Sequence, residues 1–191
     1  MKKSLLIAVI LMFVSCKSLI RSAYGITEPK SENKESLTSY LNSKKISTDN
    51  ILLANSETNY VEYLKDFGSI PEALLFDSNG DPLSYKNESQ DCNAGLFSTI
   101  PELNSNTKLK QIEGKKLSEF VENLIDFNGN KITNLPEADF YMFISWAKFT
   151  GKLNKDHVKV WEELAEQNKS VKIKVFKVNM DFKDGWEIEF K

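Results

Sequence analysis

Short apolar runs alternate with longer amphipathic segments along most of this chain. Apolar or alternating runs with polar or turn residues at their ends predict strands. The strands are expected at residues 50–56, 70–77, 81–85, 138–147, 171–180 and 186–190. Apolar positions at helical spacing predict helices, which are expected at residues 58–69, 114–127 and 154–167. Strands that alternate with helices indicate an α/β fold.

The first residues have a different pattern. A pair of lysines precedes an uninterrupted apolar stretch from Leu5 to Val14. This stretch is shorter than the roughly 20 residues that a membrane-spanning helix needs. Residues 1–15 are therefore predicted to be a secretory signal peptide.

The end of this segment, Phe13-Val14-Ser15-Cys16, resembles a bacterial lipobox, in which a small residue precedes an obligatory cysteine. The resemblance implies cleavage after Ser15, acylation of Cys16 and attachment to a membrane of the cell envelope, on the periplasmic face or the cell surface. Phe13 departs from the pattern, because leucine is usual there. The alternative is an ordinary signal peptide followed by a coincidental cysteine.

Composition narrows the classes of function. Of 191 residues, 41% are hydrophobic, enough to bury a core. The net charge is −2 and basic residues are not clustered, which argues against a nucleic-acid partner. The only cysteines are Cys16 and Cys92, so a chain lipidated at Cys16 forms no internal disulfide. Neither a metal site nor a cofactor is indicated.

The chain divides into three parts. After the signal peptide, residues 16–36 are expected to hold the lipidated cysteine and a flexible tether, since residues 25–36 are almost entirely polar. A single domain is expected over residues 37–191. Within it, residues 86–111 have no clear period and are predicted to form a long loop.

The segment FISWAKFTGKL, residues 143–153, resembles the strand and turn that carry the W-C-G-P-C dithiol of thioredoxins. The likeness continues into the helix that ends EELAEQ and the strand KVFKVNMD, whose Asn-x-Asp ending is similar to that of thioredoxins. These residues, 138–182, resemble the front half of the thioredoxin fold.

The back half appears earlier in the chain. YVEYLKDFGSIPEALLFD resembles the thioredoxin helix, cis-proline and strand, with Ile70-Pro71 at the cis-proline position, and GKKLSEFVENLI resembles the closing helix. The resemblance implies a thioredoxin-like three-layer sandwich with its halves in permuted order and a central mixed sheet of about five strands. The alternative is an ordinary α/β domain whose pattern mimics both halves.

The two cysteine positions of the thioredoxin motif hold Thr150 and Leu153. Dithiol exchange needs an attacking thiolate and a second, resolving cysteine, so this chemistry is not expected. Thioredoxin folds also bind extended peptides beside the cis-proline. By that resemblance, Pro71, Lys148, Thr150 and Lys152 are candidates for contact with a partner.

Two further residues have side chains capable of chemistry. Cys92 lies in the long loop, and the thioredoxin resemblance implies a position near Pro71 and Thr150. It is the weak catalytic candidate, for single-thiol redox or peroxide chemistry. Its neighbours include no cation that would lower the thiol pKa, which favours an inert cysteine. His157, the only histidine, is expected to face solvent.

The resulting prediction is a lipid-anchored envelope protein without dithiol oxidoreductase activity that binds a protein or peptide partner. The alternatives are an enzyme acting through Cys92 and an envelope spacer or immunity-type lipoprotein.

Overall fold

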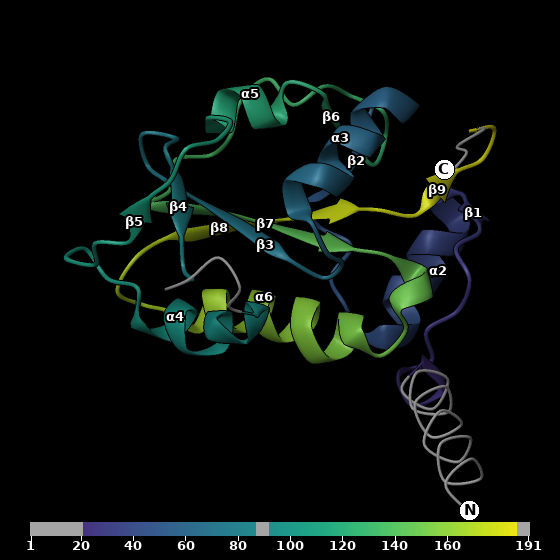
Figure 1. The fold of residues 1–191 in the computed structure, drawn as a ribbon, viewed down its shortest axis with the longest axis horizontal. Helices are drawn as coiled ribbons and strands as arrows, with labels where there is room; N and C mark the ends of the chain where they lie inside the picture. Colours follow the sequence, from purple (N-terminus) through teal and green to yellow (C-terminus); the bar gives the residue numbers. More distant parts are fainter. Residues whose placement is uncertain (1–20, 87–91, 187–191) are drawn as a thin grey trace, which may run out of the picture.

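The computed structural model describes residues 21–86 and 92–186. Its centre is a mixed sheet of seven strands (Figure 1). In spatial order the strands are β5 (Lys110–Gln111), β4 (Pro82–Ser84), β3 (Ala73–Asp77), β7 (Phe140–Trp146), β8 (Ile173–Asn179), β2 (Ile51–Ala54) and β6 (Leu124–Asp126). Strands β7, β8 and β2 are parallel, and the remaining neighbours pair antiparallel. A separate pair joins β1 (Ser31–Glu32) to β9 (Phe182–Lys183).

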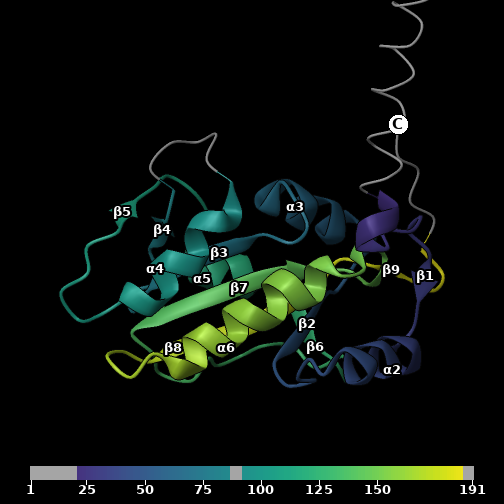
Figure 2. The same ribbon diagram turned by 90° about the horizontal axis from the view of Figure 1, so that it is seen from below.

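Helices cover both faces of the large sheet. One face carries α2 (Lys34–Lys44), α4 (Leu96–Glu102) and α6 (Val160–Gln167), the last continuing a π-helical stretch over Asn154–Lys159. Figure 2 shows α6 lying across the sheet, with α4 to its left and α2 to its right. The other face carries α3 (Glu57–Phe67) and α5 (Leu117–Val121). The α/β prediction is confirmed at this level.

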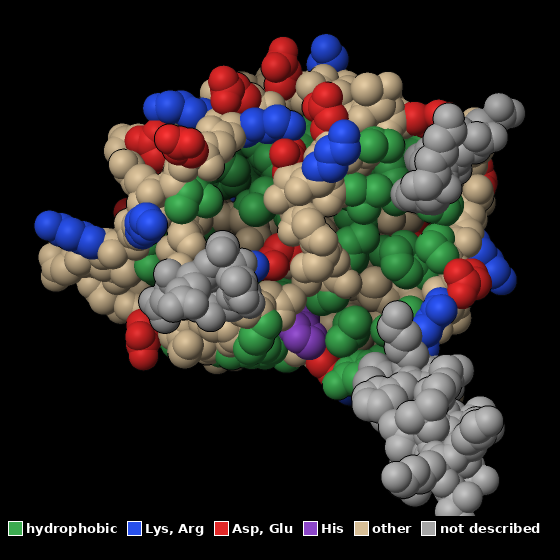
Figure 3. All heavy atoms as spheres, in the orientation of Figure 1, with side chains coloured by type: hydrophobic (Ala, Val, Ile, Leu, Met, Phe, Trp, Pro, Cys, Tyr) green, Lys and Arg blue, Asp and Glu red, His purple; other side chains and the backbone are tan. Residues whose placement is uncertain are grey.

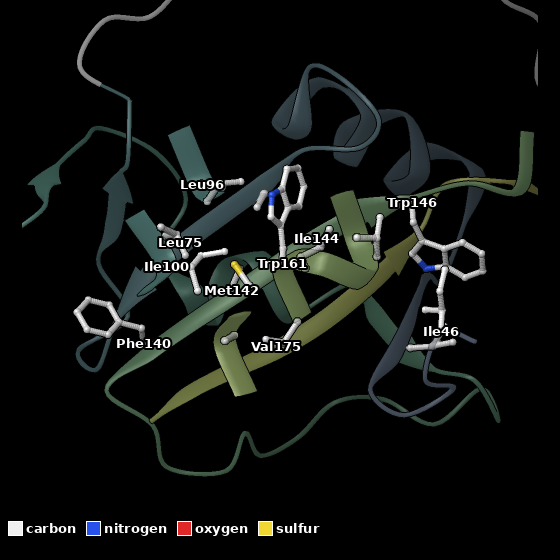
Figure 4. Packing of buried hydrophobic residues seen from close by; sticks show 14 of the residues in the cluster. Ile46, Leu75, Leu96, Ile100, Phe140, Met142, Ile144, Trp146, Trp161 and Val175 are labelled. Carbon is white, nitrogen blue, oxygen red and sulfur yellow. The ribbon is translucent and has the colours of Figure 1, made fainter. Parts of the chain in front are cut away.

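Strand β7 lies at the middle of the core because all seven of its residues are buried. Successive side chains point to opposite faces of a sheet, so Met142 and Ile144 pack towards α6 while Tyr141 and Phe143 pack towards α3 and α5. Figure 4 shows the first cluster, with Trp161 of α6 beside Ile144. Strand β7 lies within the strand predicted at residues 138–147.

The sheet is wider than the five strands expected, because two short strands extend its edges. Residues 114–127 were expected to form one helix, which is wrong: α5 ends at Val121 and the chain then forms β6. Strand β6 pairs with β2, with Leu53 opposite Ile125. The backbone of this segment therefore forms hydrogen bonds with the outer edge of β2, and Leu124 is fully buried there.

The unpatterned loop 86–111 is also partly folded. It contains α4, which packs against α6, and β5 at the sheet edge. The amide of Asn168 donates to the carbonyls of Ile100 and Leu103, 2.9 and 2.8 Å away, and so holds the end of α4. The last predicted strand, 186–190, lies almost wholly outside the described residues.

Helix α3 turns its aromatic residues towards the core. Its buried residues are Tyr60, Tyr63 and Phe67, whereas Val61 and Leu64 are only half-buried. The aromatic side chains are larger and two of them pack on Phe120 of α5, so they occupy the core side. Val61 and Leu64 are left at the margin of the molecule.

Candidate functional site

The turn after β7 contains Thr150, at the first dithiol position of the thioredoxin resemblance. Its side chain is buried, with 4% exposure. The hydroxyl group lies 2.7 Å from the carbonyl oxygen of Ala147 and 3.0 Å from Oδ1 of Asn154. Thr150 therefore serves the structure of the turn and presents no side chain to a partner.

The turn is covered by residues 21–32 of the same chain, which we call the N-terminal arm. The backbone amide of Lys152 donates to the carbonyl of Tyr24 at 2.7 Å, and its ammonium donates to the carbonyl of Ala23 at 2.7 Å. The amide of Thr27 donates to the carbonyl of Phe149 at 2.9 Å. Part of the segment expected to be a flexible tether is therefore docked on the domain, and these contacts begin well before Leu37.

Glycine is required where the arm crosses the turn. A Cβ atom on Gly151 would lie 2.3 Å from the carbonyl oxygen of Tyr24 and 2.4 Å from that of Gly25. Gly151 also has a φ of +61°, which other residues rarely adopt. Its importance is visible only when the arm and the turn are seen together.

Lys148 is also engaged by the arm. Its ammonium lies 2.7 Å from the carboxylate of Glu32, whose side chain is 11% exposed. Its backbone amide donates to the carboxylate of Asp181 at 2.7 Å. The lysines expected to contact a partner, Lys148 and Lys152, thus both contact their own chain.

Pro71 lies on a neighbouring loop and is buried. The Ile70-Pro71 peptide bond is cis, as the resemblance implied. The carbonyl of Pro71 accepts a hydrogen bond of 2.7 Å from the side-chain amide of Asn93. Since Cys92 precedes Asn93, this cysteine is brought towards Pro71 as predicted, and it is exposed. Among the described residues, no hydrogen bond joins Cys92 to Thr150.

A buried carboxylate next to Pro71 was not predicted. Glu72 is 5% exposed and accepts hydrogen bonds from the Tyr85 hydroxyl, from the Lys86 ammonium at 2.8 Å and from the Ala73 amide at 2.9 Å. Burial, followed by the hydrogen bond to Glu72, raises the pKa of Tyr85 above its ordinary value. The positive charge of Lys86 is therefore paired with Glu72, and no pattern in the sequence singles out this cluster.

His157 does not face solvent as expected. It is half-buried and packs edge-on against Phe97 and Trp161, with ring centres 5.5 and 5.2 Å away. Burial lowers the pKa of His157 below its ordinary value. Trp161 lies one helical turn after His157 in the sequence, whereas Phe97 comes from α4 and is not visible in the local sequence.

A pocket of about 300 Å³ opens at the carboxyl ends of the parallel strands β2 and β8. Most of its surface is apolar, and the apolar side chains are Leu37, Leu53, Ala54, Ile125, Phe127 and Trp186. Asn179 and Asp181, which end and follow β8, are polar lining residues that are almost completely buried. The carboxyl ends of parallel strands are a common place for ligand sites in open α/β sheets.

Asp181 is held in an unusual state for a carboxyl group. It is 5% exposed and accepts hydrogen bonds from the backbone amides of Lys148 and Phe149 and from the side chain of Asn179. Burial raises its pKa to about 6, although these donors oppose the shift. At neutral pH the Asp181 carboxylate is therefore negatively charged although burial removes most of its hydration, which is unfavourable.

We expect the carboxyl carbon of Asp181 to titrate near pH 6 in a carbon-13 NMR experiment, well above the ordinary value of 3.8. The folded chain binds this proton more tightly than the unfolded chain does. The resulting stabilisation is complete below about pH 3.8 and is lost as the pH rises through about 6. Asp126 is the internal control, because hydrogen bonds from Asn130 lower its pKa; titration of both residues below pH 4 would contradict the assignment.

Comparison of the chain with protein-family models, curated proteins and solved structures finds no match. Over residues 21–86 and 92–186, no three His, Cys, Asp or Glu side chains are grouped to hold a metal ion. Among the helices in the same ranges, none combines the length and apolar character that crossing a membrane requires. The features available for assigning function are therefore the turn, the pocket and the surface around them.

Proposed function

We propose that this chain is a lipid-anchored protein of the bacterial cell envelope whose thioredoxin-like domain binds a protein partner without dithiol chemistry. The arrangement of two segments supports the permuted thioredoxin resemblance. The strand β7, its turn, α6 and β8 form one unit, and α3, Pro71, β3 and β4 form the other. They join through the β3–β7 pair, where Leu75 lies opposite Met142.

The chemistry of the turn argues for binding over redox catalysis. Neither Thr150 nor Leu153 can form a disulfide, and the N-terminal arm covers the adjacent Gly151. The Pro71 carbonyl already accepts a hydrogen bond from Asn93, so one backbone group beside the cis-proline is engaged within the chain. These contacts favour a neighbouring surface as the place where a partner binds.

The observation that carries the proposal is an apolar surface next to this turn, which we call the α3 face. Half-buried apolar side chains from four segments pack on the same core cluster there, namely Val61, Leu64, Ile70, Phe149 and Phe182. Figure 3 shows apolar side chains gathered beside α3, on the side towards β9. Apolar patches of this kind on a protein surface are typical of protein interaction sites.

The anchor would hold the domain close to the membrane. Cys16 precedes Ala23 by seven residues, and Ala23 is already bound to Lys152. Seven extended residues reach about 25 Å. A partner of the α3 face is therefore expected at or near the membrane surface, and not at the end of a long tether.

A photo-cross-linking amino acid at position 64 tests the α3 face in cells. We expect one discrete adduct in the membrane fraction, and we expect Val61→Asp to lower its yield at least tenfold. The same cross-linker at Gln167, an exposed position on α6 across the sheet, is the matched control and should give no adduct.

Equal adducts from positions 64 and 167, or a yield that Val61→Asp leaves unchanged, would refute the proposed surface. Attachment of the chain to the membrane through lipid is tested separately, with a Cys16→Ser variant in the same cells. The Cys16→Ser chain should lose processing and attachment through lipid, and normal maturation of that variant would refute the lipid anchor alone.

A further inference from the structure

We propose that the pocket at the carboxyl ends of β2 and β8 binds a small organic amine, with its ammonium group at Asp181 and an apolar, preferably aromatic, body against the pocket walls. This site is separate from the α3 face. The inference goes beyond the proposed function and does not depend on it or on lipidation.

The charge inside the pocket favours a cation. The hydrogen bonds that Asp181 accepts come from neutral donors, two backbone amides and the amide of Asn179. The nearby carboxylate of Glu32 is already neutralised by Lys148. Within the described structure, Asp181 is thus a buried carboxylate with no ion-pair contact, and a bound ammonium group would provide the missing counter-charge.

The shape and walls of the pocket limit the rest of the ligand. A volume of about 300 Å³ lies at the small end of ligand sites, which suits a single ring with a short chain. Phe127 and Trp186 offer aromatic surface, and Leu53 and Ile125 offer aliphatic surface.

Among the charged side chains that line the pocket, carboxylates outnumber lysines three to two. The charged side chains that line the pocket are Glu32, Lys34, Asp181, Lys183 and Asp184. Lys34 is already engaged, since its ammonium lies over the Phe127 ring and donates to Asn128 at 2.6 Å. An anionic ligand would have to place its charge beside Asp181 and Glu32, which is unfavourable.

Three probes of similar size test the assignment on the full chain in detergent at pH 7.5. Calorimetric titration should show 2-phenylethylamine binding at least tenfold more tightly than 2-phenylethanol, with no binding of 3-phenylpropionate. Asp181→Asn should abolish the preference for the amine over the alcohol. Asp156→Asn removes an exposed carboxylate elsewhere and should leave that preference unchanged.

Two further measurements keep the test decisive. Ile125→Trp should fill the pocket and weaken binding of both the amine and the alcohol. In the unchanged chain, amine affinity should fall below about pH 6, as Asp181 becomes protonated, and this result decides the matter if Asp181→Asn does not fold. Absence of amine binding, equal affinities for amine and alcohol, or a pH-independent affinity would overturn the proposal.

Discussion

Glu162→Ala should lower the free energy of unfolding by about 3–5 kcal/mol, because it would leave the ammonium of Lys177 buried without a counter-charge. Lys177 lies in β8 with a fully buried side chain, and it is paired with Glu162 of α6, whose side chain is 10% exposed. Burial raises the pKa of Glu162, and the charge of Lys177 opposes that shift. The two charges therefore depend on each other inside the core.

Urea unfolding of three variants separates this cause from a general loss of packing. The double replacement Glu162→Leu with Lys177→Met should recover most of the loss, since it removes both charges and retains volume. Glu163→Ala breaks an exposed pair with Lys159 on the same helix and should change stability by no more than about 0.5 kcal/mol. A double variant as unstable as Glu162→Ala would show that the ion pair is not the cause.

Gly151→Ala should detach the N-terminal arm from the turn after β7. The new Cβ atom would collide with the carbonyls of Tyr24 and Gly25, and the backbone would be strained by its positive φ. We expect the amide protons of Thr27 and Lys152, which are bonded across this contact, to exchange with solvent at least tenfold faster. Hydrogen exchange read by NMR measures both amides directly.

Gly68→Ala is the matched control for strain alone. Gly68 has a φ of +70° at the end of α3, but a Cβ atom added there would meet no described atom within 4 Å beyond its chain neighbours. This replacement should cost about 1 kcal/mol of stability and leave the exchange of Thr27 and Lys152 unchanged relative to global unfolding. Unchanged exchange in Gly151→Ala would mean that the arm is not held where the structure places it.

The Glu162–Lys177 pair and the docked N-terminal arm were not predicted from the sequence, for related reasons. Lys177 lies on the same face of β8 as Ile173 and Val175, out of phase with Lys172 and Lys174, and its charge is balanced only because α6 places Glu162 opposite it. Residues 25–36 have the polar composition of a linker, but their backbone groups pair with the turn and with β9. Local sequence patterns indicate which side chains of a segment are suited to burial. They do not indicate the contacts of the arm, because these join residues more than 100 positions apart.

Some features of the candidate site were likewise predictable from the sequence, and others were not. Residue types alone excluded a dithiol at Thr150 and Leu153, because that conclusion depends on the absence of sulfur. The thioredoxin resemblance also implied that the loop containing Cys92 lies near Pro71, and the hydrogen bond from Asn93 to the Pro71 carbonyl agrees with this. The pocket could not be predicted, since its walls come from α2, β2, β6 and the residues after β8.

The sequence by itself predicted the main strands, including the central one within residues 138–147, and their alternation with helices, and it shows that positions 150 and 153 carry no cysteine. These follow from apolar periodicity and from side-chain chemistry, which are local. Only the tertiary structure decided that the arm covers the turn, that Val61 and Leu64 lie on the surface, and that Asp181 is buried at the end of a pocket. Each of these features depends on contacts between segments that are distant in sequence. Such contacts form, and stabilise the chain, only in the folded state.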